Sequence, residues 1–236
     1  SDLVSLLIRF STEDWNSREI SWNFSQNQLV KFRNKEIEES FDLYQVFWTN
    51  KFFQLHRNEE KLNRQFIEIY GLQEELTPDV PLEEITILQD ELDREVLKAL
   101  NARLERDPET ALITDYSNIQ LTFDAKEIFS QFVSYAVGCM FGRYSLDKEG
   151  LILANQGETL EDYLRVIVAE GIQSPAFLPD EDNIIPILND EWFEDDIVSR
   201  FKEFLRVTFG KENLEKNLAY VESAIGKNIR KYFVKD

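Results

Sequence analysis

The chain has 236 residues, of which 43% are hydrophobic, and these include 18 Phe and 4 Trp. This composition is typical of one or two domains with a sizeable core. The net charge is −19, from 26 basic and 45 acidic residues. It argues against a general DNA-binding surface, because Lys and Arg supply most of the non-specific affinity for phosphates. No apolar run approaches the roughly 18 residues of a membrane span, and the first residues do not resemble a secretory signal, so no membrane partner is expected.

The expected fold class is mainly α, a long helical hairpin followed by a helical domain with a few short strands. Before the hairpin, residues 1–34 predict a short N-terminal helix and then a linker. The linker has no regular apolar period but contains Trp15, Trp22 and Phe24. We interpret it as an extended stretch that its aromatic side chains anchor to a larger body.

Residues 35–106 predict the long antiparallel helical hairpin. The first helix is expected to end at Gly71, and the second to span residues 82–106. The first helix carries an apolar residue at every seventh position, which predicts a buried seam. The seam consists of Phe41, Trp48, Leu55, Leu62 and Ile69, and the returning helix is expected to face it with Leu88, Leu92 and Val96.

Residues 107–236 predict a mainly helical domain with short strands near 151–154 and 184–187. A capping box at Asp124 opens one helix, which runs to Phe141. Further helices are expected over 159–170, from a cap at Asn189 or Asp190 to Gly210, and over 212–225.

Residues with reactive side chains are few. The single cysteine, Cys139, excludes an internal disulfide and is expected to be buried, in agreement with a reducing, cytoplasmic location. The only histidine, His56, rules out histidine triads and multi-histidine metal sites. The acids at 180–182 and 190–196 fit no EF-hand spacing and are interpreted as helix caps. No catalytic, cofactor-binding or metal site is assigned to this chain.

The segment 134–147 combines a buried helix with a helix stop. Gly138 lies inside the helical pattern, where glycine costs about 1 kcal/mol relative to alanine, so another group is expected to pack closely against it. Gly142 is the expected C-cap, and Arg143 is placed to meet the last carbonyls. Tyr144 is then a packed tyrosine.

The pair Arg143–Tyr144 has a second interpretation, because loops on a rigid scaffold often carry contacts. These two residues could touch the DNA backbone or a neighbouring domain. Arg18 and Trp22 carry the same alternative. We treat these four residues as candidates for DNA or interdomain contact.

Four strings in this order resemble one known family. They are Ser-Arg-Glu-Ile-Ser-Trp-Asn-Phe at 17–24, the segment 62–78, the segment 134–147, and Ile-Ile-Pro-Ile at 184–187 followed by Trp-Phe-Glu-Asp-Asp-Ile-Val at 192–198. They resemble elements that lie downstream of the catalytic domain in the large adenine-specific DNA methyltransferases of type 1 BREX phage-defence systems, the PglX/BrxX family.

The resemblance implies a whole protein that uses S-adenosylmethionine to methylate adenine N6 in a specific site and takes part in excluding phage. The family's Asn-Pro-Pro-Tyr motif and its Phe-x-Gly-x-Gly donor-binding turn do not occur in this sequence. The expected role is therefore a non-catalytic segment that braces the catalytic domain against the target-recognition parts. Its expected partners are the rest of the methyltransferase chain, duplex DNA through the parent protein, and other BREX proteins.

A further expectation concerns the beginning of the chain. The only methionine is Met140, so Ser1 is not expected to be a translation start, and the chain is interpreted as a piece of a longer protein. The alternative function is a stand-alone acidic module that binds a basic protein surface.

Overall fold

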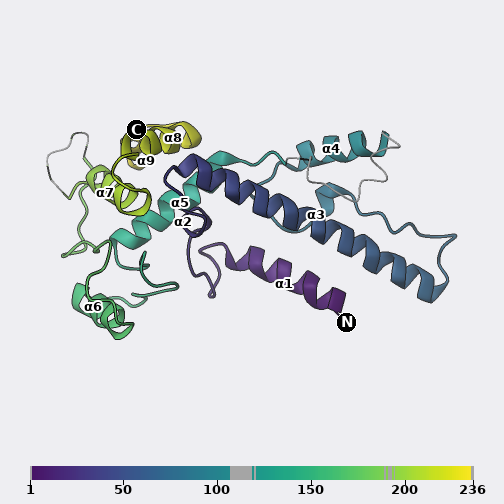
Figure 1. Cartoon of the computed structure of the whole chain (residues 1–236), viewed down its shortest axis with the longest axis horizontal. Coiled ribbons are helices and arrows are strands. Elements are labelled where there is room, and N and C mark those ends of the chain that lie inside the picture. Colours follow the sequence, from purple (N-terminus) through teal and green to yellow (C-terminus); the bar gives the residue numbers. More distant parts are fainter. Residues whose placement is uncertain are drawn as a thin grey trace. The chain divides into compact units, whose positions relative to one another are not determined.

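The computed structural model describes residues 2–106, 119, 121–188, 190, 193 and 195–234. This part of the chain is mainly helical, which confirms the expected class (Figure 1). None of its helices is long and apolar enough to cross a membrane. The elements are α1 (Asp2–Asn16), α2 (Gln28–Lys31), α3 (Ile37–Tyr70), the 3-10 turn η1 (Leu82–Glu84), α4 (Arg94–Arg106), α5 (Ala125–Met140), α6 (Leu160–Ala169), α7 (Ile197–Phe209), α8 (Leu214–Ile225) and α9 (Ile229–Phe233).

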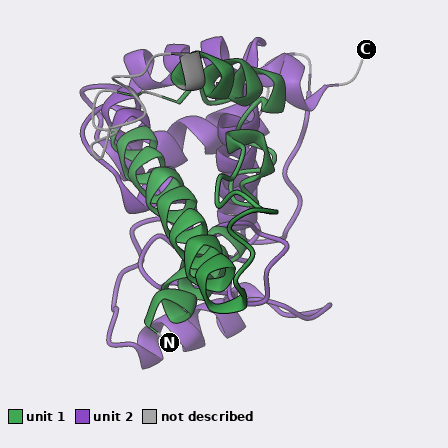
Figure 2. Ribbon diagram, turned by 90° about the vertical axis from the view of Figure 1, so that its right-hand side faces the viewer, with its two compact units in different colours: residues 1–15, 43–124 green, residues 16–42, 125–236 purple. Residues whose placement is uncertain are grey.

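The chain divides into two compact units, which Figure 2 colours separately. Unit 1 comprises residues 1–15 and 43–124, and unit 2 comprises residues 16–42 and 125–236. The helix α3 belongs to both, because its first turns are grouped with unit 2 and the rest with unit 1.

Unit 1 is built around α3 and α1. Lys51 on α3 forms an ion pair with Glu13 on α1. Its ammonium lies 4.6 Å from the centre of the Phe10 ring and 4.9 Å from that of Phe47. A cation held over aromatic faces in this way adds attraction beyond the buried area. The helix α1 is longer than the short helix that we expected, so Trp15 lies on a helix and not in a linker.

The predicted seam of α3 is buried at one end only. Trp48 and Leu55 have 0% and 1% of their surface exposed, whereas Leu62 is half-buried and Ile69 is 74% exposed. The seven-residue period is therefore correct as a helical pattern but does not mark a continuous contact. The predicted end of the helix is correct, since Gly71 follows Tyr70 with φ of +70°.

The second helix of the expected hairpin is shorter than predicted. Between η1 and Arg94, residues 85–93 are not helical, and Leu88 has φ of +56°. Side chains bond to several backbone groups of this stretch instead. The Leu88 N–H donates to the Asp14 carboxylate at 3.0 Å. The Arg94 guanidinium donates to the carbonyls of Ile85 at 2.9 Å and Ile87 at 3.2 Å. Leu88 and Leu92 are buried as expected, but Val96 is 42% exposed.

Unit 2 is a helical body whose core is rich in aromatic residues. The helix α5 contacts α7 and α8, and α7 contacts α8 and α9. Phe132 of α5 lies 5.7 Å, centre to centre, from Phe204 and 6.0 Å from Phe209 of α7. Asn217 of α8 accepts from the backbone N–H of Ile37 at 2.9 Å and so satisfies a free donor at the first turn of α3.

The short strands expected near 151–154 and 184–187 do not form. In the described residues the only β pairing is an isolated antiparallel bridge between Leu92 and Phe123. The backbone N–H groups of Ile152 and Leu153 donate to Arg143 and Gly142, which lie in a helix-ending loop and offer no neighbouring strand. Near 184–187 one backbone–backbone hydrogen bond occurs among the described residues, from the Ile197 N–H to the Pro186 carbonyl at 3.0 Å.

The boundaries of the later helices are partly as predicted. The helix α6 ends before Gly171, as expected, and α8 begins close to the expected residue. The helix α7 begins later than predicted, because its cap is Asp196, whose side chain accepts from the Val198 N–H at 2.9 Å. One of the two residues expected to cap this helix, 189, lies outside the described residues, and the other, Asp190, is not in a helix.

Candidate functional site

The candidate site is a pocket of about 410 Å³ in unit 2. It brings together three of the four candidate contact residues, Trp22, Arg143 and Tyr144. The fourth, Arg18, is not part of the lining, although its neighbour Glu19 is. The full lining is Glu19, Ile20, Ser21, Trp22, Phe24, Arg143, Tyr144 and Leu151.

The end of α5 positions one side of this pocket. The Arg143 N–H donates to the Gly138 carbonyl at 2.8 Å, and the Gly142 N–H donates to the Cys139 carbonyl at 3.1 Å. With Gly142 at φ of +71°, this pattern is a Schellman motif. The predicted C-cap is confirmed. The backbone of Arg143 meets the helix carbonyls, while its guanidinium lies 5.7 Å from the centre of the Tyr144 ring.

The floor of the pocket is a cluster of aromatic rings. Tyr144 is 3% exposed and packs directly on Gly138, where a Cβ added to the glycine would lie 2.5 Å from its ring. The prediction that another group packs closely on Gly138 is confirmed. Tyr144 also stacks on Tyr135 at 5.2 Å and meets the edge of Phe24 at 5.2 Å. Such pairs hold a ring in one orientation.

The turn after α1 supplies the other side of the pocket. The Ser21 N–H donates to the Arg18 carbonyl at 3.0 Å, and the Ser21 hydroxyl donates to Asn16 at 2.7 Å. These bonds close the turn and leave the Trp22 side chain 98% exposed. The expectation that aromatic residues anchor this segment is met by Phe24, at 6% exposure, and not by Trp22.

Glu19 lines the pocket but is not among the contact residues predicted from the sequence. Its Oε2 accepts from the Ser134 hydroxyl at 3.3 Å. Its Oε1 is buried and has no hydrogen-bond partner among the described residues. Burial raises the pKa of Glu19 above its ordinary value, against the lowering effects of Ser134 and Arg143. The only sequence signal was its place inside the 17–24 string, since nothing local predicts that one oxygen of this carboxylate is buried.

The side chains around the pocket are arranged so that they could recognise a ligand. The pocket offers a flat exposed indole, a buried acceptor that has no donor among the described residues, and a cation on one wall. A buried acceptor without a partner carries a desolvation penalty, which a ligand with N–H groups would relieve. The nearby thiol adds no reactivity, because burial raises the pKa of Cys139 and disfavours the nucleophilic thiolate.

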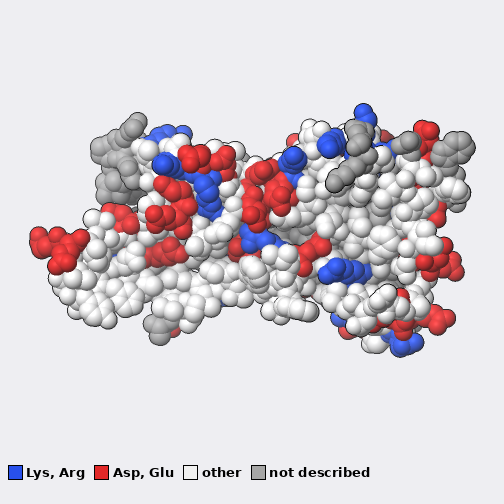
Figure 3. Space-filling model, turned by 180° about the vertical axis from the view of Figure 1, so that it is seen from behind, with Lys and Arg blue, Asp and Glu red and all other residues white. Residues whose placement is uncertain are grey.

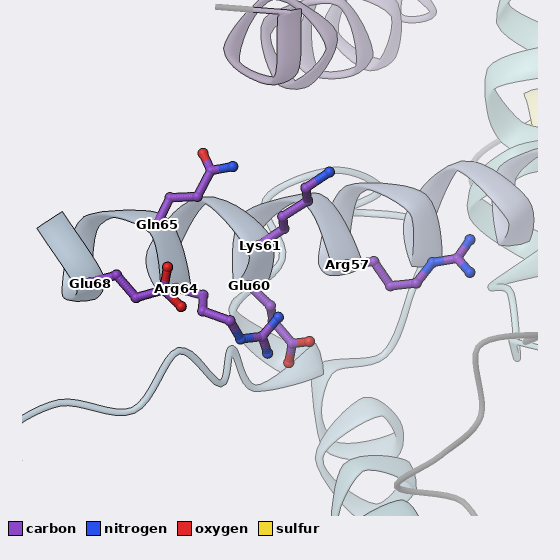
Figure 4. Close-up of a pocket in the computed structure, with 6 residues that line it drawn as sticks. All are labelled: Arg57, Glu60, Lys61, Arg64, Gln65 and Glu68. Atoms are coloured by element: carbon purple, nitrogen blue, oxygen red, sulfur yellow. The ribbon is translucent and has the colours of Figure 1, made fainter. Parts of the chain in front are cut away.

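A second hollow runs along α3 in unit 1 and has a volume of about 470 Å³. All the side chains that line it are polar, namely Arg57, Glu60, Lys61, Arg64, Gln65 and Glu68. Figure 4 shows that Lys61 and Gln65 point away from Glu60, so these groups do not converge. Glu60 already accepts from the Val80 N–H at 3.4 Å and lies 3.3 Å from His56. We regard this hollow as the weaker candidate.

Metal binding finds no support in the part of the chain that the structure describes. No group of three or more His, Cys, Asp or Glu side chains in that part could hold an ion. In the acidic loop, Asp180 and Asp182 both accept from the Ile184 N–H, at 3.0 Å and 2.9 Å. These carboxylates therefore order their own loop.

Comparison with known proteins gives two strong matches, although no protein-family model matches the chain. It is 34% identical over 233 residues to an adenine-specific methyltransferase PglX from Lacticaseibacillus casei (strain Zhang). It is also 34% identical over 224 residues to an adenine-specific methyltransferase BrxX from Escherichia coli O9:H4 (strain HS). These matches cover 96% and 95% of this chain but only 16% and 17% of the relatives. The chain is therefore a segment of the PglX/BrxX family of adenine-specific methyltransferases.

Proposed function

We propose that this chain is a non-catalytic segment of a BREX-type, site-specific adenine-N6 DNA methyltransferase, where it supports target recognition. The observation that carries the proposal is the match over nearly the whole chain to about one sixth of two such relatives, 16% and 17% of their length. In the parent protein, S-adenosylmethionine would supply the methyl group. The partners of the segment would be the rest of the methyltransferase chain, duplex DNA and other BREX proteins.

The motifs that the sequence lacks support a non-catalytic role. Methylation of adenine N6 requires a pocket for the flipped base and a site for the methyl donor. The family meets these needs with Asn-Pro-Pro-Tyr and Phe-x-Gly-x-Gly, and neither occurs in this sequence. Both functions therefore belong to other parts of the parent.

The proposed role in target recognition rests on the pocket. Trp22 is almost fully exposed beside a rigid aromatic floor, and it lies on a turn fixed by hydrogen bonds. A rigid scaffold that presents an exposed aromatic side chain is suited to contact with another surface. Arg143 on the opposite wall and Tyr144 on the floor belong to the same contact. Arg18, which is not part of the lining, would act only through the hydrogen bond that closes the turn.

The alternative, a stand-alone acidic module, draws on the net charge of −19. On the face that Figure 3 shows, however, acidic side chains occur in several separate groups with basic side chains among them. Several acidic side chains pair with basic ones, for example Glu36 with Lys216. A dispersed and partly neutralised charge favours solvated helix faces over one acidic docking surface.

The test compares this chain with the full-length parent protein by calorimetric titration with S-adenosylmethionine. The expected result is saturable binding by the parent and none by the chain. The gene upstream of the codon for Ser1 should also encode Asn-Pro-Pro-Tyr. Micromolar donor binding by the chain alone, or an upstream frame without a methyltransferase core, would overturn the proposal.

A further inference from the structure

We propose that the pocket between the 19–24 turn and the end of α5 binds one unstacked nucleotide. The base would lie against Trp22, its amino edge would face Glu19, and its phosphate would lie near Arg143. The proposal deepens the proposed function and rests on it for the source of the strand, but the recognition chemistry is argued from the pocket itself.

Trp22 supplies the stacking surface. Its side chain is 98% exposed, while Phe24, two residues later in the same turn, is 6% exposed. The turn thus buries one aromatic side chain and presents the other. Every nucleobase has a flat π-face, so an exposed indole can stack on any of them.

Glu19 supplies the edge recognition. Its buried Oε1 has no hydrogen-bond partner among the described residues. Adenine, cytosine and guanine each present an exocyclic amino group that can donate to such an oxygen, whereas thymine offers only its ring N–H. The carboxylate should therefore prefer amino-bearing bases.

Two kinds of ligand could bind a carboxylate beside an indole, a basic side chain or a nucleotide, and Arg143 favours the nucleotide. A lysine or arginine side chain from a protein partner would suit Trp22 and Glu19 alone. The guanidinium of Arg143 would repel that cation, since it lines the same pocket. A nucleotide matches all three groups, because it carries donors at one end and an anionic phosphate at the other.

The size of the pocket agrees with this ligand. Its volume of about 410 Å³ lies in the range of small-molecule sites, ~300–1,000 Å³. A base inside a duplex could not reach the indole face, so the nucleotide must come from a single strand or leave the stack. Duplex without an unpaired base should bind the pocket weakly.

The experiment is a ligand-detected NMR titration of the 236-residue chain with the four deoxynucleoside monophosphates. We expect dGMP, dAMP and dCMP to bind more tightly than dTMP. Trp22→Ala should weaken binding by roughly five- to 150-fold, the usual effect of removing a stacked aromatic. Trp22→Phe should restore part of it. Glu19→Gln should remove the preference for amino-bearing bases over dTMP. Arg143→Ala should weaken the binding of nucleotides but not that of the corresponding nucleosides.

Two matched controls separate the pocket from general effects. Trp15→Ala removes another exposed indole, in α1, and Arg165→Ala removes an exposed arginine of α6. Both should bind nucleotides like the unmodified chain, and circular dichroism should show that every variant is folded.

Several results would overturn the proposal. If N-acetylarginine amide binds in a Trp22-dependent way and nucleotides do not, the pocket accepts a basic side chain of a protein. Absence of binding by both ligands, or an equal loss in Trp15→Ala and Trp22→Ala, would also refute it. None of these results affects the donor titration that tests the proposed function, so the two failures are distinguishable.

Discussion

Tyr144 lies so close to Gly138 that no side chain fits between them. A Cβ added to Gly138 would lie 2.5 Å from Cδ2 and 2.8 Å from Cε2 of the tyrosine ring. The glycine is required for space and not for its backbone, because it lies inside α5 and is not among the positive-φ residues. Tyr144 in turn forms part of the candidate pocket.

Gly138→Ala should therefore destabilise the chain. Alanine gains about 1 kcal/mol in helix propensity over glycine. Overpacking a tight contact costs typically about 1–3 kcal/mol, and the Tyr144 ring is buried and cannot swing away, so the overpacking should outweigh the gain. Urea unfolding would show the loss as a lower midpoint.

The control for this substitution is a double-mutant cycle. In a Tyr144→Ala background the space is open, so Gly138→Ala should be neutral or stabilising. If the two changes are additive, the close approach of ring and glycine does not limit stability.

The end of α5 could be predicted from sequence because its signals are local. A helical apolar period followed by Gly142 specifies both the helix and the Schellman cap, and the cap fixes the loop that follows. The packing of a group on Gly138 could be inferred from the same stretch. The sequence did not identify Tyr144 as that group, because its position depends on how the loop after Gly142 turns.

The region before α4 shows why other predictions failed. Ile85, Leu88 and Leu92 recur at helical spacing and all three are buried, so the pattern correctly identified core residues. Their backbone is not helical: the Leu88 N–H donates to the Asp14 carboxylate, and the Ile85 carbonyl accepts from the Arg94 guanidinium. Asp14 is distant in sequence, and a pattern within one window cannot include it.

The candidate pocket, too, could be predicted only where its signals are local in the sequence. Trp22, Arg143 and Tyr144 were identified from strings, but their convergence on one pocket joins two segments that lie far apart in the sequence. Glu19 was missed because its place in the pocket depends on that convergence, which also brings it to Ser134 of α5, 115 residues away in the sequence.

Removing one partner of the buried ion pair between Asp196 and Arg230 should strongly destabilise unit 2. Asp196 is completely buried and caps α7, and both of its oxygens accept from the guanidinium, at 3.0 Å and 3.1 Å. Arg230→Met would leave this carboxylate uncompensated, which typically costs about 3–5 kcal/mol. Arg165→Met breaks an exposed pair with Asp162 and should cost less than about 1 kcal/mol. Denaturant midpoints that shift equally would contradict this difference.

The pH dependence of stability should reveal Glu19. Because burial raises its pKa in the folded state, the folded protein holds the proton more tightly than the unfolded chain does. The stability that this carboxyl contributes is present below its ordinary pKa near 4.5 and is lost as pH rises through the folded-state pKa. Glu19→Gln does not titrate, so its stability relative to the unmodified chain should improve as pH rises from below 4.5 toward neutrality.

Glu158 gives the control of opposite sign for this measurement. Hydrogen bonds from Asn155 and Ala154 lower its pKa, so its contribution is present at neutral pH and is lost on acidification. Glu158→Gln should become relatively less stable as pH rises. Thermal melts over this pH range would test both signs, and a Glu19→Gln difference that does not vary with pH would mean that the carboxylate is solvated.

The seam of α3 provides a graded test of burial along one helix. Leu55 is 1% exposed, Leu62 is half-buried and Ile69 is 74% exposed, although all three occupy the same predicted heptad position. Leu55→Ala should cost about 2–5 kcal/mol, because it removes buried methyl groups and leaves a cavity. Ile69→Ala should stay within about 0.5 kcal/mol, since its side chain is already in water. Leu62→Ala should fall between them. Urea midpoints of the three variants would decide the matter: a loss at Ile69 as large as that at Leu55 would mean that the far end of α3 is covered in solution.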